Sequence, residues 1–350
     1  MPKENKVRLG LAGVGWIGSE HARNIMANPK AQLAAVMDTR PEAMQAFQKQ
    51  HGLTCATFTD YRQMLASPID AVVIASPNKA HAEMCVEAAR QKKHIYCEKP
   101  MGISLEDCRR VREAVEQAGV KYLIGYHRRL NPLYQYAQGL ITSGKLGKPF
   151  MIESDYLHHV PGNLDIWSWL GKKSIAGSLF HAGSGHNVDL IRYFLGEIAE
   201  VTAFRGTFLP RENQVETEDA AVAIYKFQSG AIGKVQFCIG PILPFTFNFR
   251  IYGTRGSVID NRVYLDTFPR HTEPAHEKDC IELPRSWVPD NVQGGISDTW
   301  NKLMDHFIDM LTDNAACLND VASAYRTSVA CFAAMEAAET GKVIETKRLE

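Results

Sequence analysis

Short apolar runs alternate with longer amphipathic segments over the first 125 residues of the chain. Short apolar runs are typical of buried strands, and segments whose apolar residues recur with the helical period are typical of helices. Their alternation predicts βαβ units, which build a parallel sheet with helices on both faces. We therefore expect a doubly wound α/β domain over residues 1–125. The segments are VRLGLAG, HARNIMAN, QLAAVMD, EAMQAFQKQHG, AVVIAS, HAEMCVEAARQ, HIYCE, LEDCRRVREAVEQAG and YLIGYH.

The pattern changes from about residue 148 onward. Aromatic-rich segments now alternate apolar with polar positions, as antiparallel strands do, and the turn QSG predicts a hairpin. Two helical runs, 297–312 and 320–341, close the chain. We expect a second, α+β domain over residues 126–350, with a large, mostly antiparallel open sheet and a last helix that can pack back on the first domain. Its strand segments are PFMIESDYLH, EVTAFRGTF, AAVAIYKFQSGAIGKVQFCIG and TFNFRIYGTRGSVIDN.

Length and charge agree with two domains and a small-molecule ligand. A chain of 350 residues suits two domains of about 100 to 200 residues each. Lys and Arg together number 39, as do Asp and Glu, so the formal net charge is zero. A neutral chain gives no electrostatic argument for a nucleic-acid or anionic-membrane partner, and we expect neither.

The chain shows no signal for export or for a membrane. No apolar run approaches the 18 or so residues of a membrane span, and MPKENKVRLG leads into a strand instead of an apolar signal core. The eight cysteines are scattered without CxxC or Cys/His pairing, which is typical of free thiols in a reducing compartment. We therefore expect a cytoplasmic protein.

A glycine-rich loop follows the first predicted strand. Gly13, Gly15 and Gly18 have G-x-G-x-x-G spacing, and strand, loop, helix and second strand occur in the order of a dinucleotide-binding fingerprint. Gly13 permits a tight turn, Gly15 lets the backbone approach a pyrophosphate, and Gly18 lets helix and strand pack closely. The helix N-terminus then offers free N–H groups to the phosphates. The alternative is a glycine turn that binds no cofactor.

Asp38 ends the second predicted strand, 20 residues after Gly18. A carboxylate there accepts hydrogen bonds from the adenosine ribose hydroxyls and repels a 2′-phosphate. The sequence therefore favours NAD over NADP. Arg40, two residues further on, keeps the alternative open, because a guanidinium there can meet that phosphate.

Motifs along nearly the whole chain occur in the order found in one oxidoreductase family. They are GVGWIG, TDYRQML, SPN with a nearby histidine, EKP, GYHRRLNP, SGKLGKP and GHNVDLIRYFLGE. The chain thereby resembles the glucose-fructose oxidoreductase, inositol dehydrogenase and rhizopine-catabolism family (Gfo/Idh/MocA). The resemblance implies an N-terminal Rossmann domain and a C-terminal α/β domain, whose open sheet forms one wall of the active site and joins a homodimer or homotetramer. It also implies NAD(P)-dependent chemistry on sugars, inositols or related polyols.

The resemblance gives Lys99 a catalytic role. In the family the lysine of EKP lies beside the nicotinamide and the substrate hydroxyl, and Pro100 resembles a proline that shapes this turn, often in cis. An X-Pro bond restrains Lys99 to extended conformations, and a fixed cation near a reacting alcohol lowers the pKa of the hydroxyl. The alternative is a surface lysine on a loop. Besides the glycines and Asp38, the cofactor-binding candidates are Trp16, Ile17, Thr39, Arg40, Ser76, Pro77, Asn78, His81, Glu98, Lys99 and Pro100.

The segment AGSLFHAGSGHNVDLIRYFLGE runs from a glycine-rich loop into an amphipathic helix. In the family it carries D-x-x-x-H and a further aspartate, and His186 with Asp189 matches the last part. His186 is the predicted general base, since an imidazole with a pKa of about 6.5 can accept a hydroxyl proton at neutral pH; a helix cap or packing residue is the alternative. Ala182 stands where inositol dehydrogenases have the first aspartate, so either His181 substitutes through a one-residue loop shift or substrate recognition differs. Asp189 orients a basic group or caps the turn.

Four further residues are predicted to line the substrate pocket. Tyr156 and His158 end an alternating strand whose tip would face the cofactor, and Arg128 belongs to HRRLNP. Trp167, in DIWSW beside Asp165, is an aromatic residue of the kind that stacks against sugar faces. Structural roles are equally open for all four. We expect no metal site, because no spacing such as HExxH appears among His158, His159, His181 and His186.

Three functions are compatible with these residues. The leading one is an NAD-dependent oxidoreductase that transfers a hydride between nicotinamide and a hydroxyl or keto carbon of a sugar, inositol or related polyol, with Lys99 and His186 at that carbon. The second is an NAD-dependent glycoside-cleaving enzyme, which oxidises transiently, eliminates the leaving group and needs a further base such as Tyr156. The third is a non-catalytic NAD-binding sensor, against which the presence of both Lys99 and His186 argues.

Overall fold

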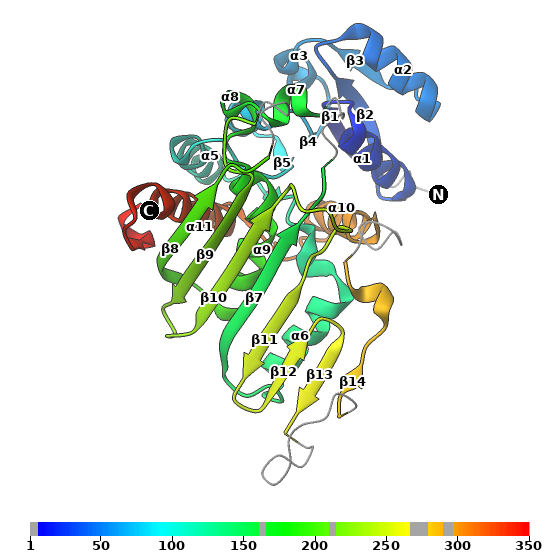
Figure 1. The fold of residues 1–350 in the computed structure, drawn as a ribbon. Coiled ribbons are helices and arrows are strands. Elements are labelled where there is room, and N and C mark those ends of the chain that lie inside the picture. Colours follow the sequence, from blue (N-terminus) through cyan, green and yellow to red (C-terminus); the bar gives the residue numbers. More distant parts are fainter. Residues whose placement is uncertain (1–5, 161–165, 210–214, 267–278, 290–296, 350) are drawn as a thin grey trace. The chain divides into compact units, whose positions relative to one another are not determined.

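The computed structural model describes residues 6–160, 166–209, 215–266, 279–289 and 297–349 (Figure 1). The chain folds into two compact units. Unit 1 consists of Met1–Tyr126, Ser174–Gly177 and Trp300–Ser328, and unit 2 consists of His127–Lys173, Ser178–Thr299 and Val329–Glu350. Unit 1 therefore includes two segments that the sequence places within the predicted second domain. Three helices contribute residues to both units: α8 (Lys173–Ala176), α10 (Ser297–Thr312) and α11 (Val321–Thr340).

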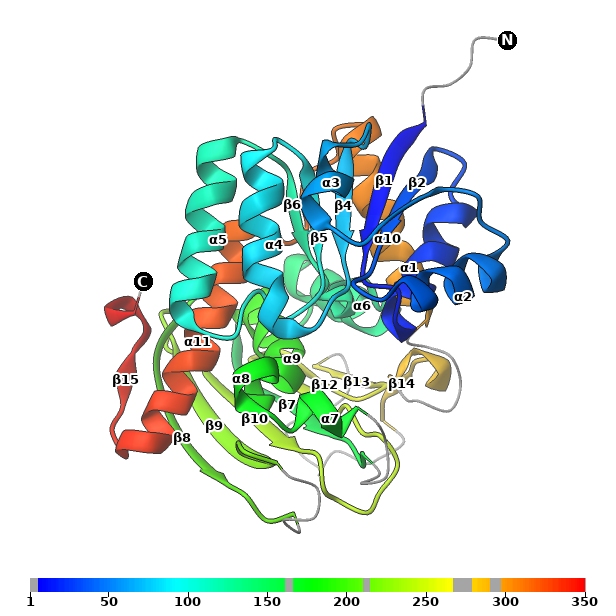
Figure 2. The same cartoon turned by 90° about the horizontal axis from the view of Figure 1, so that it is seen from above.

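Unit 1 is built on a parallel six-stranded sheet with the order β3-β2-β1-β4-β5-β6. Strand β4 is buried at every residue, as expected where helices cover both faces. Helices α4 and α5 pack side by side on one face of the sheet (Figure 2). The strand order reverses between β1 and β4, which is where doubly wound sheets bind ligands. These observations confirm the predicted α/β fold.

The elements of unit 1 follow the predicted alternation of strand and helix. The strands are β1 (Val7–Ala12), β2 (Ala31–Met37), β3 (Ala56–Phe58), β4 (Ala71–Ile74), β5 (His94–Cys97) and β6 (Tyr122–Ile124). The helices that connect them are α1 (Trp16–Ala27), α2 (Pro41–His51), α3 (Tyr61–Ala66), α4 (Asn78–Arg90) and α5 (Leu105–Ala118). Two of these helices start at side-chain caps: Asp60 accepts from Gln63 N, and Ser104 accepts from Asp107 N.

A segment close to the C-terminus completes unit 1. Asn28 donates from Nδ2 to Oδ1 of Asp305 at 2.7 Å. The ring of Phe307 meets the buried ring of Tyr96 edge-on, with centroids 5.7 Å apart. The residues of α10 that belong to unit 1 are therefore part of the core of that unit, although they lie about two hundred positions further along the chain than Tyr96.

Unit 2 contains a nine-stranded sheet with the order β14-β13-β12-β11-β7-β10-β9-β8-β15. Strands β7 and β10 are parallel, and the other neighbouring pairs among the described strands are antiparallel. The predicted hairpin around QSG is confirmed, because β9 and β10 pair antiparallel on either side of it. The strands are β7 (Pro149–Leu157), β8 (Ile198–Gly206), β9 (Ala220–Phe227), β10 (Ile232–Cys238), β11 (Phe249–Gly253), β12 (Gly256–Ile259), β13 (Arg262–Leu265), β14 (Ile281–Glu282) and β15 (Ile344–Glu345).

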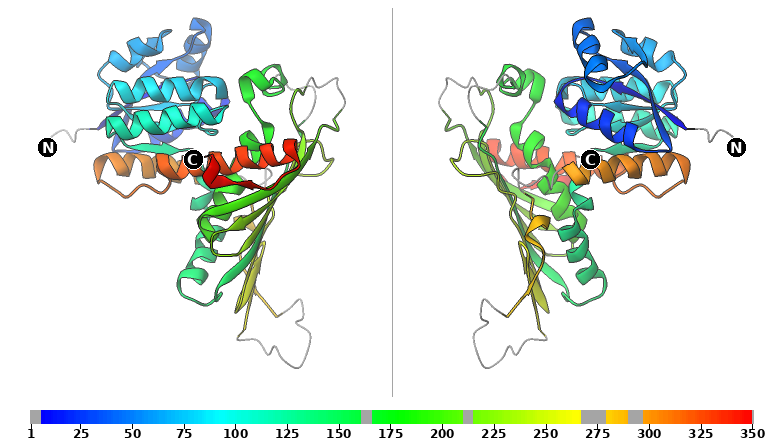
Figure 3. Two further views of the ribbon diagram at one scale, coloured as in Figure 1. Left: turned by 90° about the vertical axis from the view of Figure 1, so that its left-hand side faces the viewer. Right: turned by 90° about the vertical axis from the view of Figure 1, so that its right-hand side faces the viewer.

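Helices lie on one face of this sheet (Figure 3). Asn187 of α9 donates from Nδ2 to Ser154 Oγ of β7 at 2.8 Å. Gly183 of α9 lies so close to β10 that a Cβ there would be 2.7 Å from the ring of Phe237. The short and long helices of unit 2 are η1 (His127–Leu130), α6 (Pro132–Thr142), α7 (Trp167–Leu170), α9 (Leu179–Leu195), η3 (Arg285–Trp287) and η4 (Thr346–Arg348).

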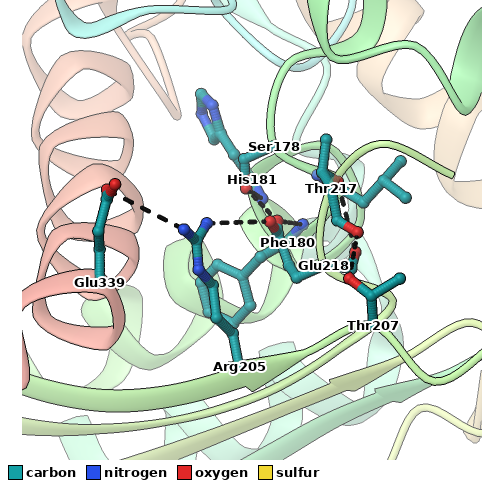
Figure 4. A network of polar contacts seen from close by, with 9 residues as sticks. Ser178, Phe180, His181, Arg205, Thr207, Thr217, Glu218 and Glu339 are labelled. Carbon is teal, nitrogen blue, oxygen red and sulfur yellow. Dashed lines mark hydrogen bonds and ion pairs between the residues drawn. The ribbon is translucent and has the colours of Figure 1, made fainter.

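The N-terminus of α9 is fixed by a buried carboxylate (Figure 4). Ser178 is the N-cap, and its Oγ accepts a hydrogen bond from His181 N at 3.2 Å. Glu218 accepts hydrogen bonds from Ser178 Oγ and, at 2.8 Å, from Phe180 N. Arg205 pairs with the other carboxylate oxygen of Glu218 at 3.4 Å. Because a helix N-terminus favours negative charge, this network sets where α9 begins.

Glu218→Gln is expected to lower the free energy of unfolding by about 2 kcal/mol, because the amide cannot replace a buried charge that accepts two hydrogen bonds and faces Arg205. Urea denaturation followed by circular dichroism measures the loss. The matched control is Glu339→Gln, since Glu339 is 72% exposed and 4.0 Å from the same Arg205, so its change should stay below about 0.5 kcal/mol. Equal effects in the two variants would contradict the anchoring role of Glu218.

Candidate active site

The glycine loop between β1 and α1 turns as its spacing predicts. Gly13 has a φ of +96°, and a Cβ there would lie 2.6 Å from the carbonyl oxygen of Ala75. A Cβ at Gly18 would lie 2.1 Å from the carbonyl oxygen of Gly13, so only glycine lets helix and loop come this close. Gly15 faces open space, with no heavy atom within 4 Å of the position of a Cβ.

The N-terminus of α1 is open to an anion. Gly15 is the N-cap without a side-chain capping hydrogen bond, and the first turn contains no acidic residue. Gly15 and Trp16 are exposed, and Ile17 is half-buried. The first N–H groups of a helix lack partners within the helix, and the helix dipole favours negative charge beside them. This uncapped end fits the pyrophosphate of a dinucleotide.

Asp38 directly follows β2 and contacts the glycine loop. Its Oδ2 accepts a hydrogen bond from Val14 N at 3.3 Å, and its Oδ1 accepts from Arg40 N at 3.1 Å and Arg40 Nε at 3.2 Å. The hydrogen bond to Asp38 raises the pKa of Arg40, and Thr39 between them is exposed. The guanidinium that would meet a 2′-phosphate is thus paired with the carboxylate that would repel one.

His81 joins two loops that follow neighbouring strands of the parallel sheet. Its Nδ1 lies 2.7 Å from the carbonyl oxygen of Pro100, and its Nε2 lies 2.8 Å from the carbonyl oxygen of Ser76. Burial lowers the pKa of His81, and the hydrogen bonds to the two carbonyls oppose this shift. The Lys99–Pro100 peptide bond is cis. His81 thus lies between the carbonyls of Ser76 and of Pro100, the residue that follows Lys99.

Pro77 and Asn78 lead from this loop into α4. Pro77 is the N-cap of the helix and has an extended backbone. Asn78 is buried and donates from Nδ2 to the carbonyl oxygen of Ala176 at 3.0 Å. The amide nitrogen of this cofactor-binding candidate therefore has a structural partner within unit 1.

Glu98 is a buried carboxylate next to Lys99. Nε2 of His21 lies 2.9 Å from its Oε1, and Lys99 N donates to its Oε2 at 3.2 Å. Burial raises the pKa of Glu98, but the hydrogen bond and charge of His21, together with the charge of Lys99, outweigh burial and lower the pKa overall. Gly125 permits this placement, because a Cβ there would lie 2.9 Å from Oε2. The half-buried Lys99 thus leaves β5 between a fixed carboxylate and a fixed proline.

His186, the predicted general base, lies on α9 beside a second imidazole. Its ring meets the ring of His127 edge-on, with centroids 4.8 Å apart. Nδ1 of His127 lies 2.6 Å from Oγ1 of Thr299. Both rings are buried, so each restricts the orientation of the other.

The structure corrects one of the two explanations for Ala182. Helix α9 is continuous from Leu179 to Leu195, so no loop is present that could shift His181 by one residue. Successive helical residues are rotated by 100°, which puts His181 about 140° away from His186 around the axis. The ring of His181 packs on Phe332 instead, with centroids 4.8 Å apart. Ala182, four residues before His186, is the residue on its side of the helix.

Asp189 and Trp167 occupy buried positions of unit 2. Asp189 forms a bidentate pair with Arg129, with Nη2 at 2.6 Å and Nε at 2.8 Å, so its carboxylate orients a basic group, which was one of the two predicted roles. Trp167 is buried at the start of the short helix α7. Asp165, its neighbour in the predicted aromatic loop, lies outside the described residues.

Arg128, Tyr156 and His158 lie together around two phenylalanine rings. Oη of Tyr156 and Nδ1 of His158 are 3.2 Å apart. The guanidinium of Arg128 lies over the ring of Phe247 at 4.6 Å and over that of Phe245 at 5.9 Å. The Tyr156 and Phe245 rings have centroids 5.6 Å apart. The structure thus brings three of the predicted pocket residues into one cluster.

Two family models match the chain. One, described as an oxidoreductase family with an NAD-binding Rossmann fold, matches residues 7–126, and the other, the GFO/IDH/MocA C-terminal domain, matches residues 134–259. The chain belongs to the Gfo/Idh/MocA oxidoreductase family. This membership confirms the predicted family and the predicted enzyme class, a dehydrogenase that uses a nicotinamide dinucleotide.

Relatives and solved structures agree with the family. An uncharacterized oxidoreductase, YrbE of Bacillus subtilis, is 32% identical over 256 residues, which cover 72% of this chain and 73% of that protein. Myo-inositol 2-dehydrogenase of Thermotoga maritima is 27% identical over 260 residues, 73% of this chain and 76% of that protein. The crystal structure of scyllo-inositol dehydrogenase from Lactobacillus casei with NAD(H) and scyllo-inositol has a TM-score of 0.81 and 23% identity, and the match covers 98% of this chain and 99% of that one, which shows the same fold.

Several residues of this family member's site were missed by sequence reasoning. His21 and His127 are polar partners of predicted residues, and Phe245 and Phe247 support Arg128. His127 directly precedes Arg128 in HRRLNP, a proximity that offered a signal. His21 gave none, because its partner Glu98 is 77 residues away.

Three general features concern the described part of the chain. No group of three or more His, Cys, Asp or Glu side chains there is arranged to hold a metal ion. Within the same residues, no helix combines the length and apolarity required to cross a membrane. The eight cysteines all lie in this part of the chain and are not joined in disulfides.

The different surroundings of Gly18 and Gly15 predict different effects of substitution by alanine. Gly18→Ala should lower the free energy of unfolding by about 3 kcal/mol, because the new Cβ overlaps the Gly13 carbonyl. Gly15→Ala, the matched control, should cost less than about 1 kcal/mol of stability. It should nevertheless weaken NAD binding at least about tenfold, since its methyl group occupies space needed by the pyrophosphate.

Urea denaturation and a calorimetric NAD titration separate these effects. A wild-type denaturation midpoint for Gly18→Ala would refute the packing role. Wild-type NAD affinity for Gly15→Ala would refute the binding role of the loop.

Proposed function

We propose that this protein is an NAD-dependent dehydrogenase that transfers a hydride between nicotinamide and a hydroxyl or keto carbon of a sugar, inositol or related polyol. One observation carries the proposal: Lys99 leaves the dinucleotide-binding sheet in a turn held by buried Glu98 and by His81 through Pro100. Three groups, Glu98, His81 and Pro100, therefore restrain the backbone from which the side chain of Lys99 extends. The name of the myo-inositol 2-dehydrogenase relative supports a polyol as the substrate class.

Each catalytic candidate has a defined part in this proposal. When bound, NAD accepts or returns the hydride at its nicotinamide ring. The ammonium of Lys99 donates a hydrogen bond to the reacting oxygen of the substrate and stabilises the negative charge that develops there. The imidazole of His186 takes the hydroxyl proton during oxidation and returns it during reduction. His127, fixed by Thr299, keeps the ring of His186 in one orientation.

We assign the substrate-binding surface to the cluster of Arg128, Tyr156 and His158. Their polar groups and the neighbouring phenylalanine rings match the mixed polar and apolar surface of a sugar. Asp189 acts through Arg129, and the candidates His181 and Trp167 are buried residues of the same unit. This assignment leaves Ala182 as the place where recognition departs from that of inositol dehydrogenases.

The glycoside-cleaving alternative finds less support. It needs a base that removes an acidified C–H proton, and Tyr156 was the candidate. Burial raises the pKa of Tyr156 to about 12, even though the charge of Arg128 opposes the shift. A phenol with such a pKa is protonated at neutral pH and is a poor general base.

We further propose that the protein works in the cytoplasm as a homodimer or homotetramer joined through its large sheet. Strand β9 buries every second residue and exposes Val222 and Ile224 on the other face, and Ile232 of β10 is exposed as well. An apolar face of this kind is typical of an interface between copies of a chain.

Lys99→Met tests the central role. With a substrate found by screening sugars, inositols and their keto forms against NAD and NADP, kcat should fall by about 10²- to 10⁴-fold, because the developing alkoxide loses its cation. The Kd for NAD should change less than about twofold. Cofactor absorbance gives the rate, and calorimetry gives the Kd.

The matched control for Lys99→Met is Lys49→Met, on the exposed side of α2, which should leave both quantities unchanged. Undiminished turnover in Lys99→Met would refute the catalytic assignment. NAD binding without turnover of any compound by the unmodified protein would favour a sensor instead.

Asp38→Ala tests the choice of cofactor. The variant should bind NAD about tenfold more weakly and should discriminate less against NADP, because it loses the ribose contact and releases Arg40. Arg40→Ala is the matched counterpart and should keep the preference for NAD. The measurement is kcat/KM with NAD and with NADP. An unchanged preference for NAD in Asp38→Ala would show that another group selects the cofactor.

A further inference from the structure

Arg128 is a buried guanidinium of unit 2 whose donors are not satisfied. The residue is 3% exposed, and its Nε and Nη1 are buried without a hydrogen-bond partner. Phe247 and Phe245 lie against it at 4.6 and 5.9 Å. These cation–π contacts stabilise the face of the guanidinium, but they leave the N–H groups of Nε and Nη1 unpaired.

No carboxylate compensates this charge among the described residues. Burial lowers the pKa of Arg128, and only the hydroxyls of Tyr134 and Tyr156 oppose that shift. A guanidinium remains protonated in spite of such a shift. The buried acidic residues of the described part of unit 2 are engaged elsewhere: Asp155 with Lys234, Asp189 with Arg129, Glu218 with Arg205, and Asp219 with the N–H groups of Phe208 and Leu209.

The neighbouring arginine shows what a structural guanidinium looks like in this fold. Arg129 is also largely buried, at 10% side-chain exposure, but it forms a bidentate pair with Asp189. A buried charge without such a partner has a large desolvation cost. Arg128 therefore differs from Arg129 in that its Nε and Nη1 have no partner and can bind a ligand.

We propose that Arg128 binds a carboxylate of the substrate, so that the enzyme acts on a sugar acid or another polyhydroxy carboxylate. This inference rests on the proposed dehydrogenase function and names its substrate class. The unpaired N–H groups of Nε and Nη1 can each donate a charge-assisted hydrogen bond to a carboxylate oxygen. One cation balances one negative charge, which favours a carboxylate over the dianion of a phosphate monoester.

The surroundings of Arg128 suit the rest of such a substrate. Tyr156 Oη and His158, 3.2 Å apart, supply polar contacts for hydroxyl groups. Phe245 and Phe247 supply apolar faces for the C–H side of a sugar. Neutral polyols would share these contacts, but they would leave the guanidinium donors unpaired. A site with buried donors discriminates strongly against a ligand that leaves them without a partner.

The test compares neutral and acidic compounds of matched structure as substrates with NAD. The pairs are glucose and glucuronate, galactose and galacturonate, and sorbitol and gluconate, with glucose 6-phosphate as the phosphate arm. The wild type is expected to show a kcat/KM at least roughly 100-fold higher for the acid of a productive pair. Arg128→Met should lose this preference, and Arg128→Lys should retain part of it.

Arg255→Met is the matched control for charge removal in the same unit. Arg255 is 60% exposed and pairs with Asp266 at 3.2 Å, so the preference for acids should survive its loss. Thermal unfolding with NAD present gives a readout that does not depend on turnover. Acids should raise the Tm of the wild type more than their neutral partners do, and this difference should vanish in Arg128→Met.

The stability of Arg128→Met without ligand is a second independent readout. Its Tm should equal or exceed that of the wild type, because the substitution removes an uncompensated buried charge. A marked fall in Tm would identify Arg128 as a structural cation and would overturn the inference.

The outcomes separate this inference from the dehydrogenase proposal. Equal turnover of neutral and acidic compounds by the wild type and by Arg128→Met overturns the inference and leaves the dehydrogenase function standing. Stabilisation by acids that is lost in Arg128→Met, without reduced cofactor from any compound, supports the carboxylate site and overturns the dehydrogenase. A preference for glucose 6-phosphate that depends on Arg128 overturns the assignment to a carboxylate. The inference is also overturned if no acid differs from its neutral partner in kcat/KM or in its effect on Tm.

Discussion

Unit 1 depends on the close contact between Gly18 and the carbonyl group of Gly13. A Cβ at Gly18 would lie 2.1 Å from that carbonyl oxygen. No side chain separates α1 from the loop, so the helix starts close against β1 and its first N–H groups remain uncapped. The same loop brings Val14 N to the carboxylate of Asp38. The candidate phosphate-binding end and the candidate ribose-binding group are therefore fixed by one backbone approach that glycine alone permits.

Buried polar pairs place the remaining candidates, and each pair joins segments distant in the chain. His21 reaches Glu98, His81 reaches Pro100, and Glu218 fixes the start of the helix that carries His186. Buried polar groups require partners, so these bonds hold side chains and loops in single arrangements. Lys99 and His186, the two residues proposed to act on one hydroxyl, are each supported by such a network in its own unit.

Much of the fold follows from local pattern. The alternation of apolar runs with amphipathic segments predicted the parallel sheet, and period-two alternation around QSG predicted the β9–β10 hairpin, because both depend on near neighbours in the chain. The role of His181 was a different matter. Whether a loop or a helix precedes His186 depends on the cap at Ser178 and on Glu218, some 40 residues later, so the suggested loop shift had no local signal that would exclude it.

The sequence by itself determined the family, the glycine loop, the position of Asp38 at the end of a strand, and the presence of Lys99 before a proline, since these are features of spacing along the chain. Only the tertiary structure decided which charged groups are paired. Arg128 and Arg129 are adjacent residues of the same type. Arg129 pairs with a carboxylate 60 residues away, whereas Arg128 packs against two aromatic rings. Partners of this kind arrive from distant segments when the chain folds, and their identity sets the electrostatics of the site.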